Sequence, residues 1–241
     1  VLPSEEFIFF ADRDHVPYGT KSVPAVRGFV RAAFRFLIEK QRADAVVVAC
    51  NTATSVAVDE MRRLYEVPII GMEPAVKKAL ERDAERRVLV TATPITINGE
   101  KLHRLVSAHD TKGLVDLLAL PRLVEFAEHR EFASPRVEAY LWDALSPYDL
   151  RKYSALVLGC THFNYFKDTL RRLLPKTMGF VDGNGGTVEE LARRTGLTTV
   201  PAGTQTAQCS FFESGRPVAG AESLARIESY LARAARMEEI V

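Results

Sequence analysis

Short runs rich in β-branched and aromatic residues alternate along this chain with segments of helical spacing. The strand candidates span residues 7–11, 46–50, 68–71, 88–93, 156–160 and 180–182. Between them, apolar residues recur every three or four positions, as in residues 23–41 and 221–237. Strands that alternate with helices favour a parallel sheet with helices on both faces. The sequence therefore predicts an α/β fold.

Two segments carry more specific expectations. Residues 45–48, Ala-Val-Val-Val, are continuously apolar, which is typical of a strand buried on both sides. Residues 111–135 show no regular pattern, and we expect a helix with irregular chain there.

Composition excludes several classes of protein. Of 241 residues, 47% are hydrophobic and 26% charged, which is ordinary globular usage rather than disorder. Lys and Arg number 32 against 31 Asp and Glu, so the formal net charge of +1 gives no reason to expect a nucleic-acid or membrane partner. No apolar run approaches the roughly 18 residues that a membrane helix needs.

The cysteines and the N-terminus indicate a reducing compartment. Three cysteines without a Cys-x-x-Cys pair do not form a disulfide framework, and five scattered histidines argue against structural zinc. The first residues, Val1 to Glu6, lack the basic and apolar regions of a secretory signal. We therefore expect a cytoplasmic protein with free thiols and no metal.

An internal sequence repeat is the most informative motif. Residues 44–52 and 154–162 each read as a buried strand that ends in a small residue, a cysteine and polar groups, and each precedes a helix with an Arg-Arg-Leu triplet. This pattern indicates two similar α/β halves. Each half would place its cysteine, Cys50 or Cys160, at the carboxyl edge of a sheet, where ligands bind. A helix N-terminus beside each thiol favours the thiolate.

A lone cysteine at a strand end is usually a small buried hydrophobe, and we interpret Cys209 in that structural sense. Two cysteines in matching contexts favour a joint role instead. Thiol–disulfide exchange normally uses closely spaced cysteines, so we favour two-base proton transfer, in which one thiolate removes a proton and the opposing thiol returns one to the other face. Neighbouring polar residues would hold a carboxylate substrate and set thiol protonation: Asn51, Thr52, Thr161 and His162.

At these residues the sequence resembles the glutamate racemases, of the cofactor-independent aspartate/glutamate racemase superfamily. The similarity covers most of the chain. The matching stretches are residues 9–12, 16–19, 49–53, 90–96, 121–128 and 159–163. The triplet Cys160-Thr161-His162 is the sharpest discriminator, since relatives that act on aspartate more often show Cys-Thr-Glu.

The resemblance implies two pseudo-symmetric lobes, each a mainly parallel sheet flanked by helices, with the active site in the cleft between them. Residues 1–74 and 184–241 would form one lobe, closed by the C-terminal helix, and residues 75–183 the other. It implies interconversion of L- and D-glutamate, which supplies D-glutamate for peptidoglycan in the cell wall. It also implies no pyridoxal phosphate, no metal and a homodimer.

Roles for individual residues follow from the same resemblance. Cys50 would deprotonate D-glutamate and Cys160 would deprotonate L-glutamate, with His162 and Glu128 assisting the second thiol. Glu125 is a rival for the place of Glu128. The residues that match substrate-contacting positions are Tyr18, Gly19, Asn51, Thr52, Thr161 and His162. Without the resemblance, Tyr18 and Gly19 would read as a turn, and Asn51 and Thr52 as helix caps.

One part of the family pattern is missing. The family opens with a strand that runs into an Asp-Ser-Gly motif, and no Asp-Ser-Gly occurs in these 241 residues. We expect that segment to belong upstream of Val1. Two alternatives stay open, namely a racemase-like protein that binds glutamate or a protein partner without turnover, and a racemase of another amino acid such as aspartate.

Overall fold

The computed structural model describes residues 2, 5–200 and 207–241. The N-terminal segment, which we expect not to be a secretory signal, lies partly outside these ranges, at residues 1, 3 and 4. The strands are β1 (Glu6–Ala11), β2 (Val46–Val48), β3 (Ile69–Gly71), β4 (Arg87–Ala92), β5 (Val115–Ala119), β6 (Tyr153–Leu158), β7 (Gly179–Val181), β8 (Gln208–Glu213) and β9 (Arg216–Pro217). Strands and helices alternate, so the predicted α/β class is confirmed.

The helices lie between these strands and at the C-terminus. The α-helices are α1 (Val23–Phe34), α2 (Asn51–Leu64), α3 (Val76–Arg82), α4 (Pro94–Ile97), α5 (Glu100–His109), α6 (Arg122–Glu128), α7 (Pro135–Leu145), α8 (Lys167–Leu173), α9 (Asn184–Thr195) and α10 (Ala221–Glu238). The other helical segments are the 3-10 helices η1 (Tyr18–Thr20), η3 (Leu150–Lys152) and η4 (Thr161–Phe166), and the π-helix η2 (Arg35–Lys40) that extends α1.

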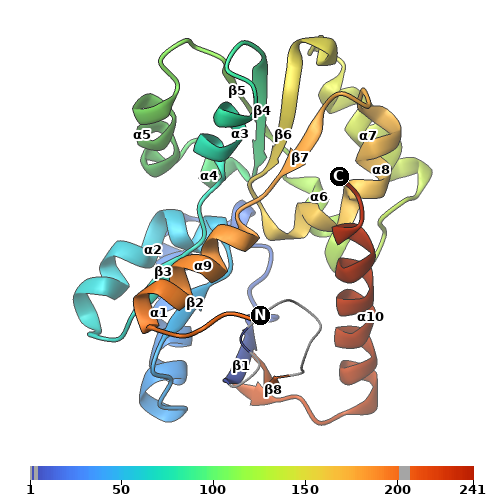
Figure 1. The fold of residues 1–241 in the computed structure, drawn as a ribbon. Coiled ribbons are helices and arrows are strands. Elements are labelled where there is room, and N and C mark those ends of the chain that lie inside the picture. Colours follow the sequence, from blue (N-terminus) through green and yellow to red (C-terminus); the bar gives the residue numbers. More distant parts are fainter. Residues whose placement is uncertain (1, 3–4, 201–206) are drawn as a thin grey trace.

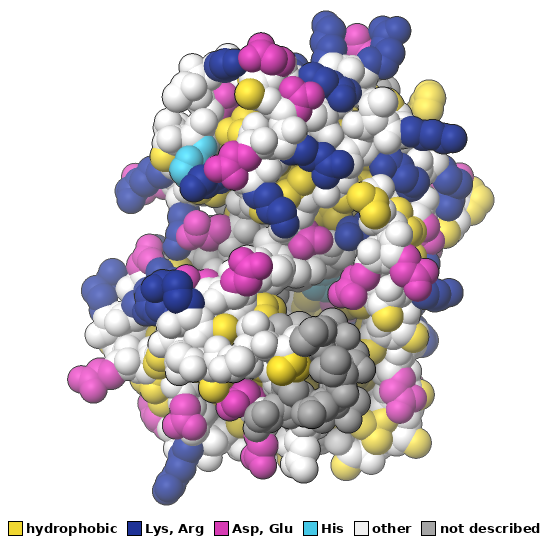
Figure 2. Space-filling view, in the orientation of Figure 1, with side chains coloured by type: hydrophobic (Ala, Val, Ile, Leu, Met, Phe, Trp, Pro, Cys, Tyr) yellow, Lys and Arg dark blue, Asp and Glu magenta, His cyan; other side chains and the backbone are white. Residues whose placement is uncertain are grey.

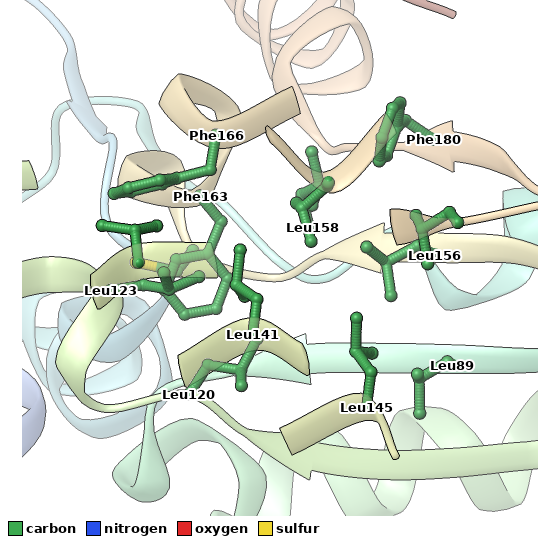
Figure 3. Close-up of a cluster of buried hydrophobic side chains, with 14 of the residues drawn as sticks. Leu89, Leu120, Leu123, Leu141, Leu145, Leu156, Leu158, Phe163, Phe166 and Phe180 are labelled. Atoms are coloured by element: carbon green, nitrogen blue, oxygen red, sulfur yellow. The ribbon is translucent and has the colours of Figure 1, made fainter. Parts of the chain in front are cut away.

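The largest sheet is parallel throughout, in the order β5-β4-β6-β7, at the top of Figure 1. Side chains alternate between its faces, as strand geometry requires. Val88 and Val90 pack toward α3 and α5, whereas Leu89 packs with α6, α7 and α8. Figure 3 shows the second of these clusters, whose members include Cys160. The cysteine is therefore fixed to a fully buried strand.

The first part of the chain builds two smaller sheets. Strands β2 and β3 pair in parallel, and β1 pairs in parallel with β8, which forms an antiparallel hairpin with β9. Helices α1 and α2 bury Val26, Val58 and Met61 against β2 and β3. The expected burial of residues 45–48 on both sides is wrong, because Val47 is 38% exposed on a sheet of two strands.

Helix α10 joins regions that are distant in sequence. In Figure 1 it runs along one side of the molecule, from the end near β8 toward α8. Its buried Arg233 donates to the carbonyl of Tyr165 and to Asp168, and the hydroxyl of Tyr230 donates to the carbonyl of Ala127. These partners belong to the range assigned above to the second lobe, and the lobe boundaries stay a prediction.

The segment 111–135 is more regular than expected, since it contains β5 and α6. Strand β5 lies at the edge of its sheet and is only partly buried, so it lacks the continuous apolar run of a central strand. Its Asp116 accepts hydrogen bonds from Arg87 and Tyr153, which explains a charged residue within the strand. Within the described ranges, no helix is long and apolar enough to cross a bilayer.

Candidate active site

Both copies of the internal repeat, at Cys50 and at Cys160, form a similar local structure. Cys50 follows β2 and is the N-cap of α2, and Cys160 follows β6 and is the N-cap of η4. Their backbone angles nearly coincide, with φ −149° and ψ 116° at Cys50 and φ −148° and ψ 133° at Cys160. Each strand thus delivers its cysteine, in nearly the same extended conformation, to the carboxyl edge of its own sheet.

The two cysteine segments lie against each other. The hydroxyl of Thr161, next to Cys160, donates to the carbonyl of Ala49, next to Cys50, at 3.4 Å. Burial chiefly raises the pKa of Cys50, and the nearby Cys160 sulfur raises it further, so the two sulfurs lie within electrostatic reach of each other. Figure 2 shows the molecule hollowed between its upper and lower parts, with acidic and basic side chains around the rim.

Cys50 is held as a neutral thiol. Burial raises its pKa to about 11, although its Sγ atom accepts a hydrogen bond from the backbone N–H of Ala53 at 3.5 Å. The helix N-terminus therefore favours the thiolate as the sequence suggested, but desolvation outweighs this donor. At neutral pH the Cys50 thiol is a proton donor.

Cys160 has a different partner. Its Sγ atom lies 4.0 Å from Nδ1 of His162, and Nε2 of the same ring lies 2.8 Å from Oε1 of Glu128. The second carboxylate oxygen, Oε2, accepts a hydrogen bond from Arg13 at 2.7 Å. A row of four interacting side chains therefore extends from Arg13 through Glu128 and His162 to Cys160.

Charges alternate from Arg13 through Glu128 to His162. Burial lowers the pKa of His162, but hydrogen bonds to Cys160 and Glu128 outweigh it and raise the pKa to about 10. Burial acts to raise the pKa of Glu128, but the hydrogen bond from His162 and the charges of His162 and Arg13 bring it below its usual value. At neutral pH His162 is an imidazolium beside Cys160.

Tyr18 and Gly19 line the same region. The Tyr18 hydroxyl donates to Oδ2 of Asp12 at 2.6 Å, while Oδ1 of Asp12 accepts from Ser214 at 3.0 Å. Burial and the hydrogen-bonded Asp12 carboxylate hold the Tyr18 pKa far above its usual value, so the phenol is neutral. At Gly19 a Cβ atom would lie 2.7 Å from Cβ of Thr93, so only glycine fits this approach.

Asn51 and Thr52, in the first turn of α2, are both buried. The amide nitrogen of Asn51 donates to the carbonyl of Met72 at 3.3 Å, and its buried Oδ1 has no hydrogen-bond partner among the described residues. The Thr52 hydroxyl lies 2.8 Å from that of Thr93. Asn51 therefore offers an unused acceptor, whereas Thr52 uses its hydroxyl within the protein.

The structure separates the two glutamate candidates. Glu128 provides the carboxylate that contacts His162, whereas the backbone carbonyl of Glu125 accepts from the ring of His129. Sequence reasoning missed Asp12 and Arg13 as part of the site. Their signal was position, because both follow the end of β1 as the cysteines follow β2 and β6.

Cys209 lies in β8 and is exposed, so it is not a small buried hydrophobe, and its structural role stays a prediction. Its strand pairs with β1, where Phe7 is the partner of Cys209 in the register. Among the described residues, no group of three or more His, Cys, Asp and Glu side chains is placed to hold a metal ion.

Comparisons with known proteins show the family of the chain. A family model described as Asp/Glu/Hydantoin racemase matches residues 2–191. The chain is 48% identical over 245 residues to the glutamate racemase of Campylobacter curvus, which covers 99% of this chain and 91% of the relative. A solved glutamate racemase isoform from Bacillus anthracis matches with a TM-score of 0.80 and 26% identity, over 96% of this chain and 86% of that one. Escherichia coli glutamate racemase, solved with L-glutamate and the activator UDP-MurNAc-Ala, matches with a TM-score of 0.74 and 27% identity, over 92% of this chain and 84% of that one.

Proposed function

Because the chain belongs to the Asp/Glu/Hydantoin racemase family, we propose that it interconverts L- and D-glutamate without a cofactor, with Cys50 and Cys160 as its two bases. One observation carries the proposal. The two cysteines follow strands of two different sheets with nearly the same backbone angles, and their segments are in contact. Cys50 lies beside a helix N-terminus and Cys160 beside an imidazolium.

The reaction from L-glutamate begins at Cys160. Its thiolate takes the α-proton, and the electron pair of the broken C–H bond stays on Cα. The Cys50 thiol then gives its proton to the opposite face, which yields D-glutamate and leaves a thiolate on Cys50. The pKa of about 11 at Cys50 and of about 10 at His162 support this direction, since they favour a protonated acid and a base stabilised by positive charge. The reverse reaction exchanges the two roles.

Polar groups near the thiols are suited to an amino acid. The unpartnered Oδ1 of Asn51 is an acceptor for the substrate ammonium. The N-terminus of α2 suits a carboxylate because of its partial positive charge, although the N–H of Ala53 already donates to the Cys50 sulfur. We place Tyr18, Gly19, Thr52 and Thr161 around the substrate on the family pattern, and His162 beside both substrate and sulfur.

The biological setting is also part of the proposal. A supply of D-glutamate for peptidoglycan, a cytoplasmic location and a homodimer rest on the resemblance to glutamate racemases. Sedimentation of the purified chain tests the dimer.

The activity is tested by incubating the purified chain with L-glutamate, no cofactor and a metal chelator, and following D-glutamate by chiral chromatography. The proposal expects equal amounts of both enantiomers at the end of the reaction. L-aspartate in a parallel reaction tests the substrate, and we expect it to be converted far more slowly. A folded chain that leaves L-glutamate unchanged would overturn the proposed activity, and faster conversion of aspartate would overturn the proposed substrate.

A further inference from the structure

Arg13 is the first of the four interacting side chains that lead to Cys160. Its guanidinium donates to Oε2 of Glu128 at 2.7 Å, while Nε2 of His162 lies 2.8 Å from Oε1. Each carboxylate oxygen therefore has its own partner. Rotation of the carboxylate would have to break both contacts, so the arginine fixes which oxygen faces the imidazole.

Glu128 needs such a partner because of its place in the fold. It is the last residue of α6, where the helix carbonyls carry partial negative charge and disfavour a carboxylate. The last turn of α6 contains no basic residue of its own. Arg13 supplies the missing positive charge from the segment that follows β1, 115 positions away in the sequence.

The segment that carries Arg13 is anchored on both sides. Asp12 accepts hydrogen bonds from Tyr18 at 2.6 Å and from Ser214 at 3.0 Å. Asp14 forms a bidentate ion pair with Arg216, at 2.7 and 2.9 Å. The backbone N–H of Arg13 itself donates to the carbonyl of Ala11 at 3.0 Å. The guanidinium therefore extends from a fixed backbone.

Other titratable groups also face Glu128, and none of them replaces Arg13. Tyr165 and Tyr230 lie near enough to interact with the charge of Glu128, but neither is cationic. The Tyr230 hydroxyl donates to the backbone carbonyls of Ala127 and Glu128, not to the carboxylate. His129 contributes a weaker charge effect, and its ring bonds to the carbonyl of Glu125.

We propose that Arg13 is a positioning residue of this enzyme: it holds Glu128 so that the carboxylate keeps the His162 imidazolium beside the Cys160 sulfur. The inference rests on the proposed function, because a fixed imidazolium matters only if Cys160 acts as a base. Arg13 touches neither the sulfur nor the reacting atoms in this account, and it acts through two intervening residues.

The test reads the Cys160 thiolate directly and needs no turnover. In a background with Cys50→Ser and Cys209→Ser, the rate of iodoacetamide alkylation of Cys160 is measured at pH 7. Arg13→Met keeps the length of the side chain and removes the charge. We expect it to slow alkylation about fivefold, the typical effect of one partly exposed ion pair. Arg13→Lys restores the charge and should stay within about twofold of the background.

The matched control is Arg151→Met, which removes an exposed arginine ion pair with Asp149 that involves neither residues 12–14 nor Glu128. It should leave the rate unchanged. General loosening of the fold would expose Cys160 and speed alkylation, which is opposite to the expected change. Equal rates in the background and in Arg13→Met, or faster alkylation in Arg13→Met with intact helical circular dichroism, would overturn the role of Arg13.

Racemisation provides the second readout. In the otherwise unchanged chain, Arg13→Met should lower kcat/KM by about fivefold. The loss should be equal from L- and from D-glutamate, because an equilibrium constant of one ties the two values together. If the unchanged chain does not racemise glutamate but Arg13→Met still slows alkylation, the proposed function fails while the positioning role of Arg13 stands.

Discussion

The hydroxyls of Thr52 and Thr93 face each other with their Oγ1 atoms 2.8 Å apart. Thr52 lies in the first turn of α2 and Thr93 follows β4, so this buried contact links the two regions that carry the cysteines. Thr96 joins them, with its Oγ1 3.2 Å from that of Thr93. The three hydroxyls form a buried network, and its loss is expected to weaken the packing of α2 against the segment that follows β4.

Thr52→Val tests this network while keeping the shape of the side chain. It should lower the free energy of unfolding by about 1–2 kcal/mol, because a buried hydroxyl loses its partner. Thr52→Ser keeps the hydroxyl and serves as the control, with a smaller expected loss. Denaturant unfolding of the three proteins measures the difference. A valine variant as stable as the unchanged chain would show that the network contributes nothing to stability.

Gly19 and Gly28 form a second matched pair. A methyl group at Gly19 would lie 2.7 Å from Cβ of Thr93, whereas one at Gly28, within α1, meets no atom within 4 Å. Gly19→Ala should therefore destabilise the fold by about 1–3 kcal/mol. Gly28→Ala should stabilise it by up to about 1 kcal/mol, because alanine is the better helix former. Thermal unfolding of both variants measures these changes. A change in stability of the same sign in both variants would contradict this account.

Each cysteine should support half of the reaction alone. In heavy water, Cys50→Ser leaves Cys160, which should still exchange the α-proton of L-glutamate for deuterium without inversion. Cys160→Ser should do the same for D-glutamate. Both variants should lose racemisation by more than about a thousandfold, because neither can protonate the opposite face.

Cys209→Ser is the control for these variants, since Cys209 is exposed on β8, and its racemisation rate should be unchanged. Racemisation that survives Cys50→Ser or Cys160→Ser near the original rate would exclude the two-thiol reaction.

The raised pKa of His162 also predicts a dependence of stability on pH. Its ordinary value is 6.5 and its value in the fold is about 10, so the folded protein binds the extra proton more tightly than the unfolded chain. The stabilisation is fully present below pH 6.5 and is lost as the pH rises through about 10. The difference in unfolding free energy between the unchanged chain and His162→Gln should therefore shrink from pH 6 to pH 10. A difference that stays constant would contradict an imidazolium at this position.

Much of the fold was predictable because its central strands are buried. All of β6 is buried, and its run of apolar residues marks it clearly in the sequence. Strand β5 escaped notice because an edge strand tolerates Asp116, whose partners Arg87 and Tyr153 come from neighbouring strands. The burial of Val47 was overestimated because the sequence does not show that β2 has a single neighbour in its sheet.

The site was predictable where function follows from a repeated local motif. Cys50 and Cys160 stood out because each follows a strand and precedes a helix. The link from Arg13 to Glu128 could not be found in the same way, because it joins residues 115 positions apart through side chains alone. The choice between Glu125 and Glu128 likewise depends on which face of the short helix α6 lies toward His162.

The most direct test of the two-thiol reaction follows both isotope and chirality in heavy water. L-glutamate is added to the unchanged chain, and the reaction is stopped before one tenth is converted. If Cys160 removes the proton and Cys50 supplies another, the new D-glutamate carries deuterium at Cα while the remaining L-glutamate keeps its proton. D-glutamate that retains the original proton, or deuterium spread equally through both enantiomers at this stage, would contradict the account.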